Sequence, residues 1–108
     1  MPTQIVEGTS VSTLINIFKV APERQQEAVE LLIEATDKHI RHLPGFISAN
    51  FHLSDDGTRI VNYAQWETPD AWRAMLDNPE CVNHIEEVKK FTEPDYHLYQ
   101  VHSTHMKD

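Results

Sequence analysis

The chain has 108 residues and carries nine Lys and Arg against seventeen Asp and Glu, which gives a net charge of −8. This length suits one domain with one hydrophobic core, and the acidic excess provides no basic surface for nucleic acid or anionic lipid. No apolar run is long enough to cross a membrane, no signal peptide is evident, and the single cysteine fits a reducing compartment, so we expect a cytoplasmic protein that binds neither nucleic acid nor membranes.

The first part of the chain predicts an arm, a strand and a helix. Residues 1–10 are polar and show no hydrophobic period, so we expect a flexible arm. Alternation over residues 11–20 predicts a strand that is apolar on both faces. Pro22 stands at a favourable first-turn position and opens an amphipathic helix, which is expected to end near Leu43, before Pro44-Gly45.

The rest of the chain predicts three strands and two helices. In order, these are a strand at 46–54, a strand at 59–68, a short helix from Pro69, a helix at about 80–91 and a strand at 96–103. The turn sequence Asp-Asp-Gly-Thr at 55–58 joins the first two of these strands into a hairpin. Pro94 is expected to end the second helix.

This order predicts an α+β fold of the ferredoxin-like βαββαβ type, an antiparallel sheet with helices on one face. We expect a single domain at 11–103, followed by a tail at 104–108. The other face of the sheet carries apolar side chains, namely Ile15, Ile17, Val61 and Tyr63. Soluble monomers rarely expose such a patch. We therefore expect a homodimer in which two sheets pair as a dimeric α/β barrel.

Two asparagines interrupt the apolar face that the sheet turns toward the helices. Asn16 shares its face with Phe18 on the first strand, and Asn62 shares its face with Ala64 and Trp66 on the third. The two strands are neighbours in this fold, so both amides converge beneath the helices. A buried amide without a partner costs about 1–3 kcal/mol, so each asparagine either caps a neighbouring backbone group or meets a ligand.

Several segments of the sequence resemble a known family. The run Pro44-Gly45-Phe46, the residue His52, the turn Asp56-Gly57-Thr58 and the segment Val-Asn-Tyr-Ala-Gln-Trp-Glu at 61–67 are similar to antibiotic-biosynthesis monooxygenases. The resemblance extends from Val11 to about Val101. It is strongest toward the cofactor-independent anthrone and quinone-forming oxygenases of aromatic polyketide pathways. It implies an enzyme that oxidises a phenolic or anthrone-type substrate to a quinone with O₂, without a metal or other cofactor.

The resemblance also implies roles for individual residues. The catalytic residues are expected to be Asn62 and Asn16, which donate to an enolate oxygen, and Trp66, which faces the substrate or bound peroxide. Substrate contacts are expected from Phe18, His52, Ala64 and Trp72. The chain departs from some family members at Trp72, where they have a tyrosine, and at Ile85-Glu86, where they have an arginine.

The position of His52 depends on the hairpin. A three-residue loop places His52 on the Asn62 face, whereas a two-residue turn places Phe51 and Leu53 there. His52 and His39 are the candidates for proton transfer, because the ordinary pKa of histidine lies near neutral pH. Histidines also recur at a spacing of three, but the other ligands of a metal site do not accompany them.

Two other functions share this fold. A dimeric barrel that binds a small aromatic compound without catalysis, or acts as a stress-related protein, is the main alternative. A haem-degrading monooxygenase needs a helix histidine at the position of Ile85. The neighbouring His84 is expected to point about 100° away from that position.

Overall fold

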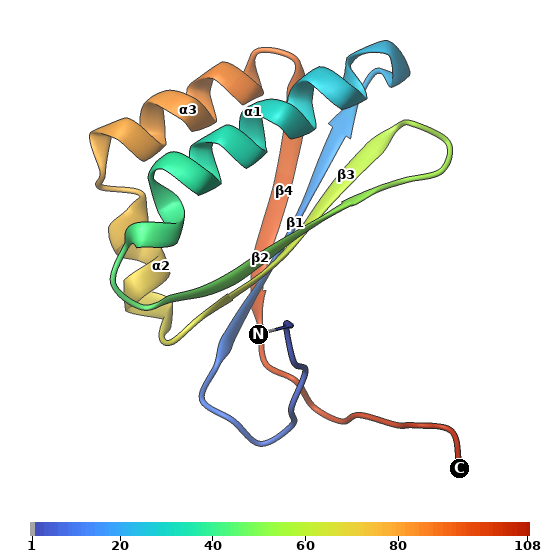
Figure 1. The fold of residues 1–108 in the computed structure, drawn as a ribbon, viewed down its shortest axis with the longest axis vertical. Coiled ribbons are helices and arrows are strands. Elements are labelled where there is room, and N and C mark those ends of the chain that lie inside the picture. The colour runs from blue at the N-terminus through green and yellow to red at the C-terminus, as the bar shows by residue number, and fades with distance from the viewer. Residues whose placement is uncertain (1) are drawn as a thin grey trace.

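The computed structural model describes residues 2–108, so Met1, at the start of the predicted arm, lies outside the described residues. Four antiparallel strands form one sheet in the order β2–β3–β1–β4, and helices cover one of its faces (Figure 1). The elements are β1 (Ser12–Val20), α1 (Gln25–Lys38), β2 (Phe46–Leu53), β3 (Arg59–Trp66), α2 (Pro69–Met75), α3 (Pro79–Lys89) and β4 (Thr92–Tyr99), with short 3₁₀ turns η1 (Pro22–Arg24) and η2 (Ile40–His42). The predicted ferredoxin-like fold is confirmed.

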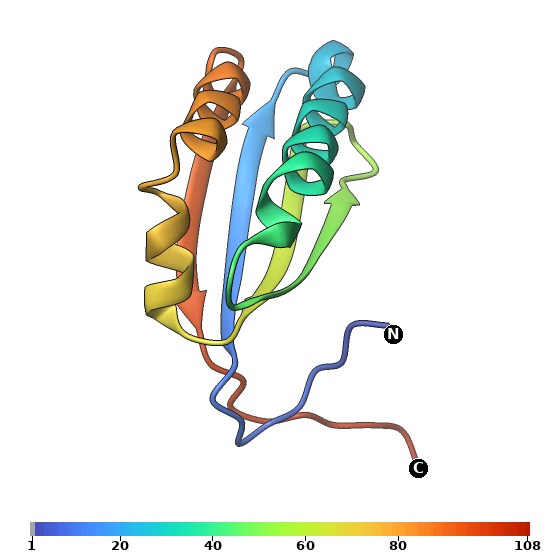
Figure 2. The ribbon, with the colours of Figure 1, turned by 60° about the vertical axis from the view of Figure 1, so that its left-hand side comes forward.

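The helices begin where side chains can cap them. The Thr68 hydroxyl accepts a hydrogen bond from the Ala71 amide at 3.1 Å at the start of α2. The Asn78 side chain accepts bonds from the amides of Glu80 and Cys81, at 3.0 and 3.2 Å, at the start of α3. These caps satisfy amides that have no partner within the helix. Helices α1 and α3 then run alongside one another over the sheet (Figure 2).

Gly45 allows the start of β2 to approach α2 closely. Its φ is +82°, a conformation that side chains disfavour, and a Cβ atom there would lie 2.5 Å from the Cβ of Ala71. Its carbonyl accepts a hydrogen bond from the Glu67 amide at 2.7 Å. A glycine at this position therefore ties the end of β3 and the first turn of α2 to the start of β2.

The core between sheet and helices consists of two hydrophobic clusters. One contains Leu14, Ala64 and Trp66 beneath α2, and the other contains Phe18 and Ile60 beneath α1. Along β1 and β3 the boundary between them falls at residues 16 and 62. The two asparagines therefore divide the core.

Two predicted boundaries were wrong. The helix expected to end near Leu43 stops at Lys38, and the turn η2 follows it. The last strand begins at Thr92 instead of residue 96, and Pro94 lies inside it. β4 is an edge strand of the sheet, where a proline can leave its missing donor on the unpaired side.

The sheet face opposite the helices is partly covered by the N-terminal arm. The Thr3 hydroxyl donates to the Asn50 side chain at 2.9 Å, and the Gln65 amide donates to the Gln4 carbonyl at 2.7 Å. Both chain ends lie at the lower end of the sheet (Figure 2). None of the helices within residues 2–108 has the length and apolar character needed to cross a membrane.

Candidate functional site

Asn16 and Asn62 lie directly opposite each other on β1 and β3. Both line a cavity between the sheet and the helices. The Oδ1 atom of each amide is buried and has no hydrogen-bond partner among residues 2–108. A buried acceptor in this state lowers stability by about 1–3 kcal/mol, and a hydroxyl group of a ligand would supply the missing donor.

The cavity encloses about 140 Å³ and is mostly apolar. All four strands contribute to its floor, and all three helices contribute to its walls. Of the seven residues predicted for the site, six line it: Asn16, Phe18, Asn62, Ala64, Trp66 and Trp72. Their period-two spacing on the strands is what brings five of them to one face.

Two aromatic pairs support the cavity wall. The buried Trp66 ring meets the edge of Phe46 with centroids 5.3 Å apart and an interplanar angle of 88°. Trp72 contacts Tyr96 of β4 with centroids 5.7 Å apart. All four rings line the cavity. A planar aromatic ligand would therefore meet ring faces or edges on two sides, the geometry that aromatic pairs favour.

The prediction that His52 contacts the substrate is corrected by the register of the hairpin. Phe51 pairs with Asn62, and His52 pairs with Val61, so His52 lies on the face opposite the helices. It is exposed and does not line the cavity. Ser54 and Arg59 close the hairpin, which leaves four residues in the loop. Because four is an even number, the residues of β2 face the same sides of the sheet as they would after a two-residue turn.

His84 is a cavity residue that the sequence did not identify. We expected it to turn away, yet His84 and Ile85 both line the cavity, together with Val88 and Lys89. Their positions repeat one turn apart on α3, so a broad stripe of this helix faces the space between sheet and helices. A signal was present in the sequence, because His84 stands one turn before Val88, which is a core residue.

No group of three or more His, Cys, Asp or Glu side chains within the described part of the chain is arranged to hold a metal ion. Cys81, in the first turn of α3, is fully buried and does not line the cavity. Burial, and to a lesser extent the nearby Glu80 carboxylate, raises the pKa of its thiol. A thiol in this setting is a poor nucleophile.

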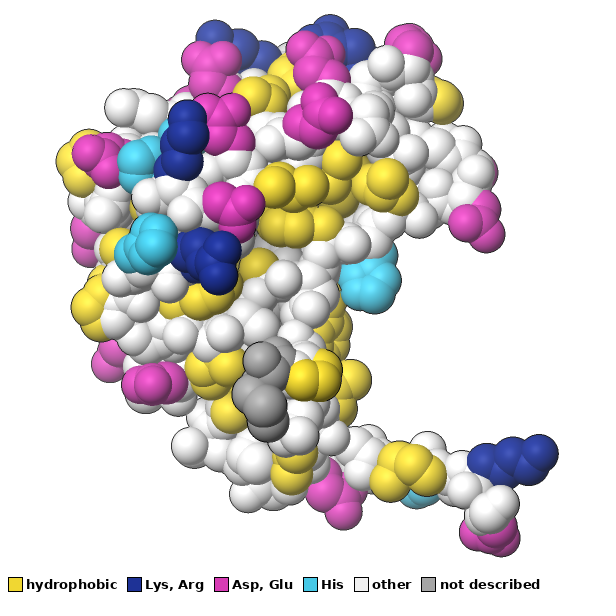
Figure 3. Space-filling model, viewed as in Figure 1, with side chains coloured by type: hydrophobic (Ala, Val, Ile, Leu, Met, Phe, Trp, Pro, Cys, Tyr) yellow, Lys and Arg dark blue, Asp and Glu magenta, His cyan; other side chains and the backbone are white. Residues whose placement is uncertain are grey.

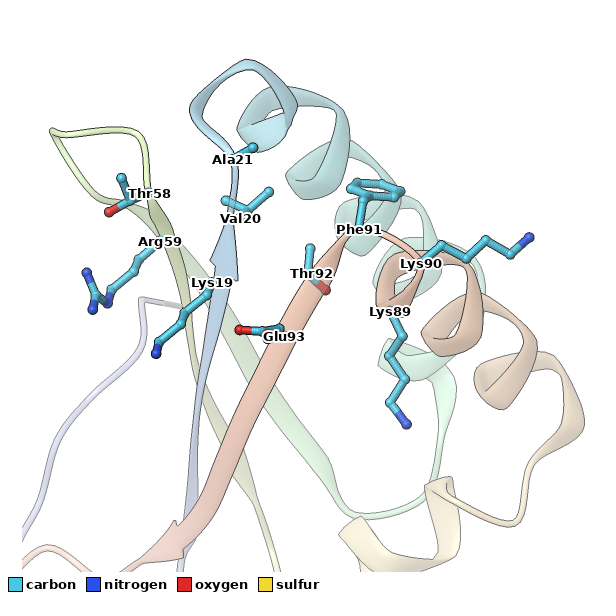
Figure 4. Close-up of a pocket in the computed structure, with 10 residues that line it drawn as sticks. All are labelled: Lys19, Val20, Ala21, Thr58, Arg59, Lys89, Lys90, Phe91, Thr92 and Glu93. Atoms are coloured by element: carbon cyan, nitrogen blue, oxygen red, sulfur yellow. The ribbon is translucent and has the colours of Figure 1, made fainter.

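A second hollow, of about 610 Å³, opens to solvent where β1 and β4 meet the end of α3. Lys19, Arg59, Lys89 and Lys90 surround it, but Figure 4 shows their side chains pointing in different directions. Each lysine of α3 is also paired with a glutamate three residues earlier, at 3.7 and 3.0 Å. The basic groups therefore do not converge on one binding point.

The charged side chains lie on the outside of the molecule. Figure 3 shows acidic and basic groups interspersed over the helices, and hydrophobic side chains gathered in the hollow between the helices and the β2–β3 hairpin. The site is thus a concave, mostly apolar cavity that holds two amide groups. Sites for small molecules typically have this composition.

The chain is similar to a family of enzymes and to one of its curated members. A family profile described as "Antibiotic biosynthesis monooxygenase" matches residues 12–87. The tetracenomycin-F1 monooxygenase of Streptomyces glaucescens is 46% identical over 82 residues, which cover 76% of this chain and 73% of that protein.

Solved structures share the fold over nearly the whole chain. A monooxygenase from the gene ActVA-Orf6 of Streptomyces coelicolor, in complex with nanaomycin D, matches with a TM-score of 0.80 at 30% identity, over 90% of this chain and 92% of that one. The cofactor-independent oxygenase SnoaB of Streptomyces nogalater matches with a TM-score of 0.78 at 22% identity, over 89% of this chain and 97% of that one. At 22% identity, the likeness to SnoaB concerns the fold.

Proposed function

Because the chain belongs to the antibiotic biosynthesis monooxygenase family, we propose that it is a cofactor-independent monooxygenase that oxidises a phenolic or anthrone-type aromatic to a quinone with O₂. The family resemblance seen in the sequence is confirmed, and the chain is an oxidoreductase. Relatives named for tetracenomycin F1 or holding nanaomycin D support the substrate class.

The pair of unpartnered amides is the observation that carries this proposal. Asn16 and Asn62 face each other across β1 and β3 inside an apolar cavity, with the indole of Trp66 on the same wall. Each amide can accept a hydrogen bond from a phenol through Oδ1 and donate one to an enolate oxygen through Nδ2. A phenolic ring system with adjacent hydroxyl and carbonyl groups would supply a donor for Oδ1 and an acceptor for Nδ2.

The proposed chemistry places charge where these amides lie. Loss of a proton leaves an enolate, which passes one electron to O₂, and the resulting radical pair combines to form a peroxide. After protonation, loss of water leaves the new carbonyl, so one oxygen atom enters the quinone and the other leaves as water. We assign Asn62 and Asn16 as donors to the enolate oxygen, and one preorganised donor of this kind lowers a barrier by about 3 kcal/mol.

The size of the cavity bears on how a substrate enters. The enclosed volume is about 140 Å³. Cavities that hold drug-sized ligands measure about 300–1,000 Å³, so a three-ring substrate needs the cavity mouth, a shift of the helices, or both. A haem macrocycle is larger still. The cavity is therefore too small for the haem-degrading alternative, although His84 lies on its wall.

We also propose that the enzyme is a homodimer. The face opposite the helices holds Ile15, Ile17, Val61 and Tyr63, each of which is only half-buried. The side chain of Tyr99, opposite Thr13 on the same face, is 47% exposed. A second sheet packed on this face would remove the patch from water.

Oxygen uptake with dithranol, a simple anthrone, tests the proposed function. The reaction is run with EDTA, without flavin, and beside a heat-denatured sample of the same protein. We expect uptake above the spontaneous rate, one O₂ consumed per quinone formed, and one ¹⁸O atom in the product under ¹⁸O₂. Saturable binding of anthrones and hydroquinones without any uptake would reject the proposal in favour of the binding protein.

A further inference from the structure

We propose that His84 is the general base of this site and that His39 and Glu80 carry its proton to solvent. The inference rests on the proposed function, because it concerns the proton that the substrate loses before O₂ reacts. The sequence had indicated His39 as a candidate for proton transfer, but neither His84 nor Glu80. The three residues come from the end of α1 and from two successive turns of α3.

Among residues 2–108, His84 is the one on the cavity wall with the chemistry of a neutral-pH base. The other ionisable residues there are Lys89 and Tyr96, whose ordinary pKa values lie near 10. An uncharged imidazole accepts a proton through its free ring nitrogen. A general base has to reach the substrate within the cavity, and His84 shares that cavity with Asn16 and Asn62.

A second histidine lies beside the first. The rings of His84 and His39 are 5.0 Å apart between centroids and tilted by 40°. The Nδ1 atom of His39 lies 2.8 Å from a carboxylate oxygen of Glu80, and the Glu80 side chain is 69% exposed. These contacts form a path from an apolar cavity, through a half-buried imidazole, to a carboxylate in water.

Charged side chains lie near the imidazole rings of His84 and His39. On α1, the Glu34 carboxylate accepts a hydrogen bond from Lys38 at 2.8 Å, which lowers the pKa of the Glu34 carboxyl, and the charges of His84 and His39 lower it further. From α3, Glu80 is the contact partner of His39. Glu34 is already paired with Lys38, so the Glu80 carboxylate is the group that can stabilise an added positive charge on His39.

A C–H or phenolic O–H bond of the substrate breaks, an N–H bond forms on His84, and the electron pair stays on the substrate as an enolate. The resulting imidazolium gives a proton to His39, directly or through one water, and His39 releases a proton to Glu80 and solvent. His84 is then neutral again, and no electron has left the substrate before it meets O₂.

Deuterium exchange in the absence of oxygen isolates this step. Dithranol is incubated with the protein in D₂O under nitrogen, and NMR follows the loss of its C10 methylene protons over a range of pH. We expect the parent protein to accelerate exchange, with a rate that rises as an imidazole loses its proton. His84→Gln should reduce the acceleration at least tenfold and abolish this pH dependence, and added imidazole should restore exchange in His84→Ala.

His42 provides the matched control. It is an exposed histidine in η2 that contacts the Asp37 carbonyl at 3.1 Å and does not line the cavity, so His42→Gln should leave exchange unchanged. His39→Gln and Glu80→Gln test the positioning residues. If they carry the proton outward, their exchange rates become dependent on buffer concentration while the parent's rate does not.

The outcomes separate the two proposals. Exchange in His84→Gln at the parent's rate would overturn the assignment of the base, whatever the oxygen uptake. Accelerated exchange that depends on His84, without oxygen uptake, would support the base and reject the monooxygenase. A folded parent protein that accelerates neither exchange nor uptake would reject both. Rates independent of buffer in His39→Gln and Glu80→Gln would remove those residues from the path.

Discussion

Asn16 and Asn62 face each other across β1 and β3, and the side-chain oxygen of each is buried without a hydrogen-bond partner among residues 2–108. They also stand where the two hydrophobic clusters of the core meet, so an apolar residue at either position would join these clusters. A chain that retains two amides there gives up stability at its core. Such a trade-off is typical of residues kept for binding or catalysis.

We expect Asn62→Leu and Asn16→Leu to stabilise the fold. Leucine has the same number of side-chain heavy atoms in a similar branched shape and removes an unpartnered buried oxygen, so each change should raise the free energy of unfolding by roughly 1 kcal/mol. Urea denaturation at one fixed protein concentration measures this change.

Asn50→Leu is the control for that stability measurement. The Asn50 amide donates to the Tyr63 carbonyl and its oxygen accepts from Thr3, both at 2.9 Å, so the same substitution should destabilise the protein. A loss of stability in both cavity variants equal to that of Asn50→Leu would mean that the cavity amides are satisfied within the folded protein.

Asp56 gives the fold a defined dependence on acid. One of its carboxylate oxygens accepts hydrogen bonds from the hydroxyl and amide of Thr58 and from the hydroxyl of Ser54, at 2.7, 2.9 and 2.9 Å. These bonds, those of Thr58 first, lower the pKa of the Asp56 carboxyl to about 2. A pKa lowered by folding means that the charged form stabilises the fold above about pH 4 and that this contribution is lost as the pH falls toward 2.

The comparison of Asp56→Asn with the parent protein tests this dependence. We expect the variant to be less stable at pH 7 and at pH 5, and the difference to shrink between pH 4 and pH 2. Chemical denaturation across this range provides the measurement. A difference that stays constant or widens in acid would show that the charge of Asp56 is not what stabilises the turn.

The open sheet face predicts the mass of the protein in solution. Light scattering should give twice the 12.5 kDa of one chain. Ile17→Asp places a charge in the centre of the proposed interface and should yield the single-chain mass, because burying an unpaired carboxylate is strongly unfavourable. Lys19→Asp, at the end of the same strand face, is the control and should keep the parent's mass. A parent protein of 12.5 kDa at micromolar concentration would contradict the dimer.

Much of the site could be predicted because strands alternate strictly. Once β1 and β3 are neighbours, a period of two places Asn16, Phe18, Asn62, Ala64 and Trp66 on one face whatever the details of the loops. Sequence alone could not place the residues of β2 in the same way. Their face depends on the number of residues in the hairpin loop, and that count decided the position of His52.

Helical residues were harder to place than strand residues. His84 and Ile85 are neighbours about 100° apart around α3, and both reach the cavity because the helix turns a broad face toward it. The contact between His84 and His39 depends on how α1 and α3 pack, which no local pattern encodes. Pro94 misled the prediction of β4 because only the sheet order shows that this strand lies at an edge.

The most direct test of the central claim measures oxygen uptake with dithranol in matched variants, with metals chelated and no flavin present. We predict that uptake falls at least tenfold in Asn62→Ala and in Trp66→Phe, and that it is unchanged in Asn83→Ala, which alters an exposed asparagine of α3 outside the cavity. Folded Asn62→Ala and Trp66→Phe proteins that consume oxygen at the parent's rate would contradict the account, because the chemistry would then take place away from this cavity.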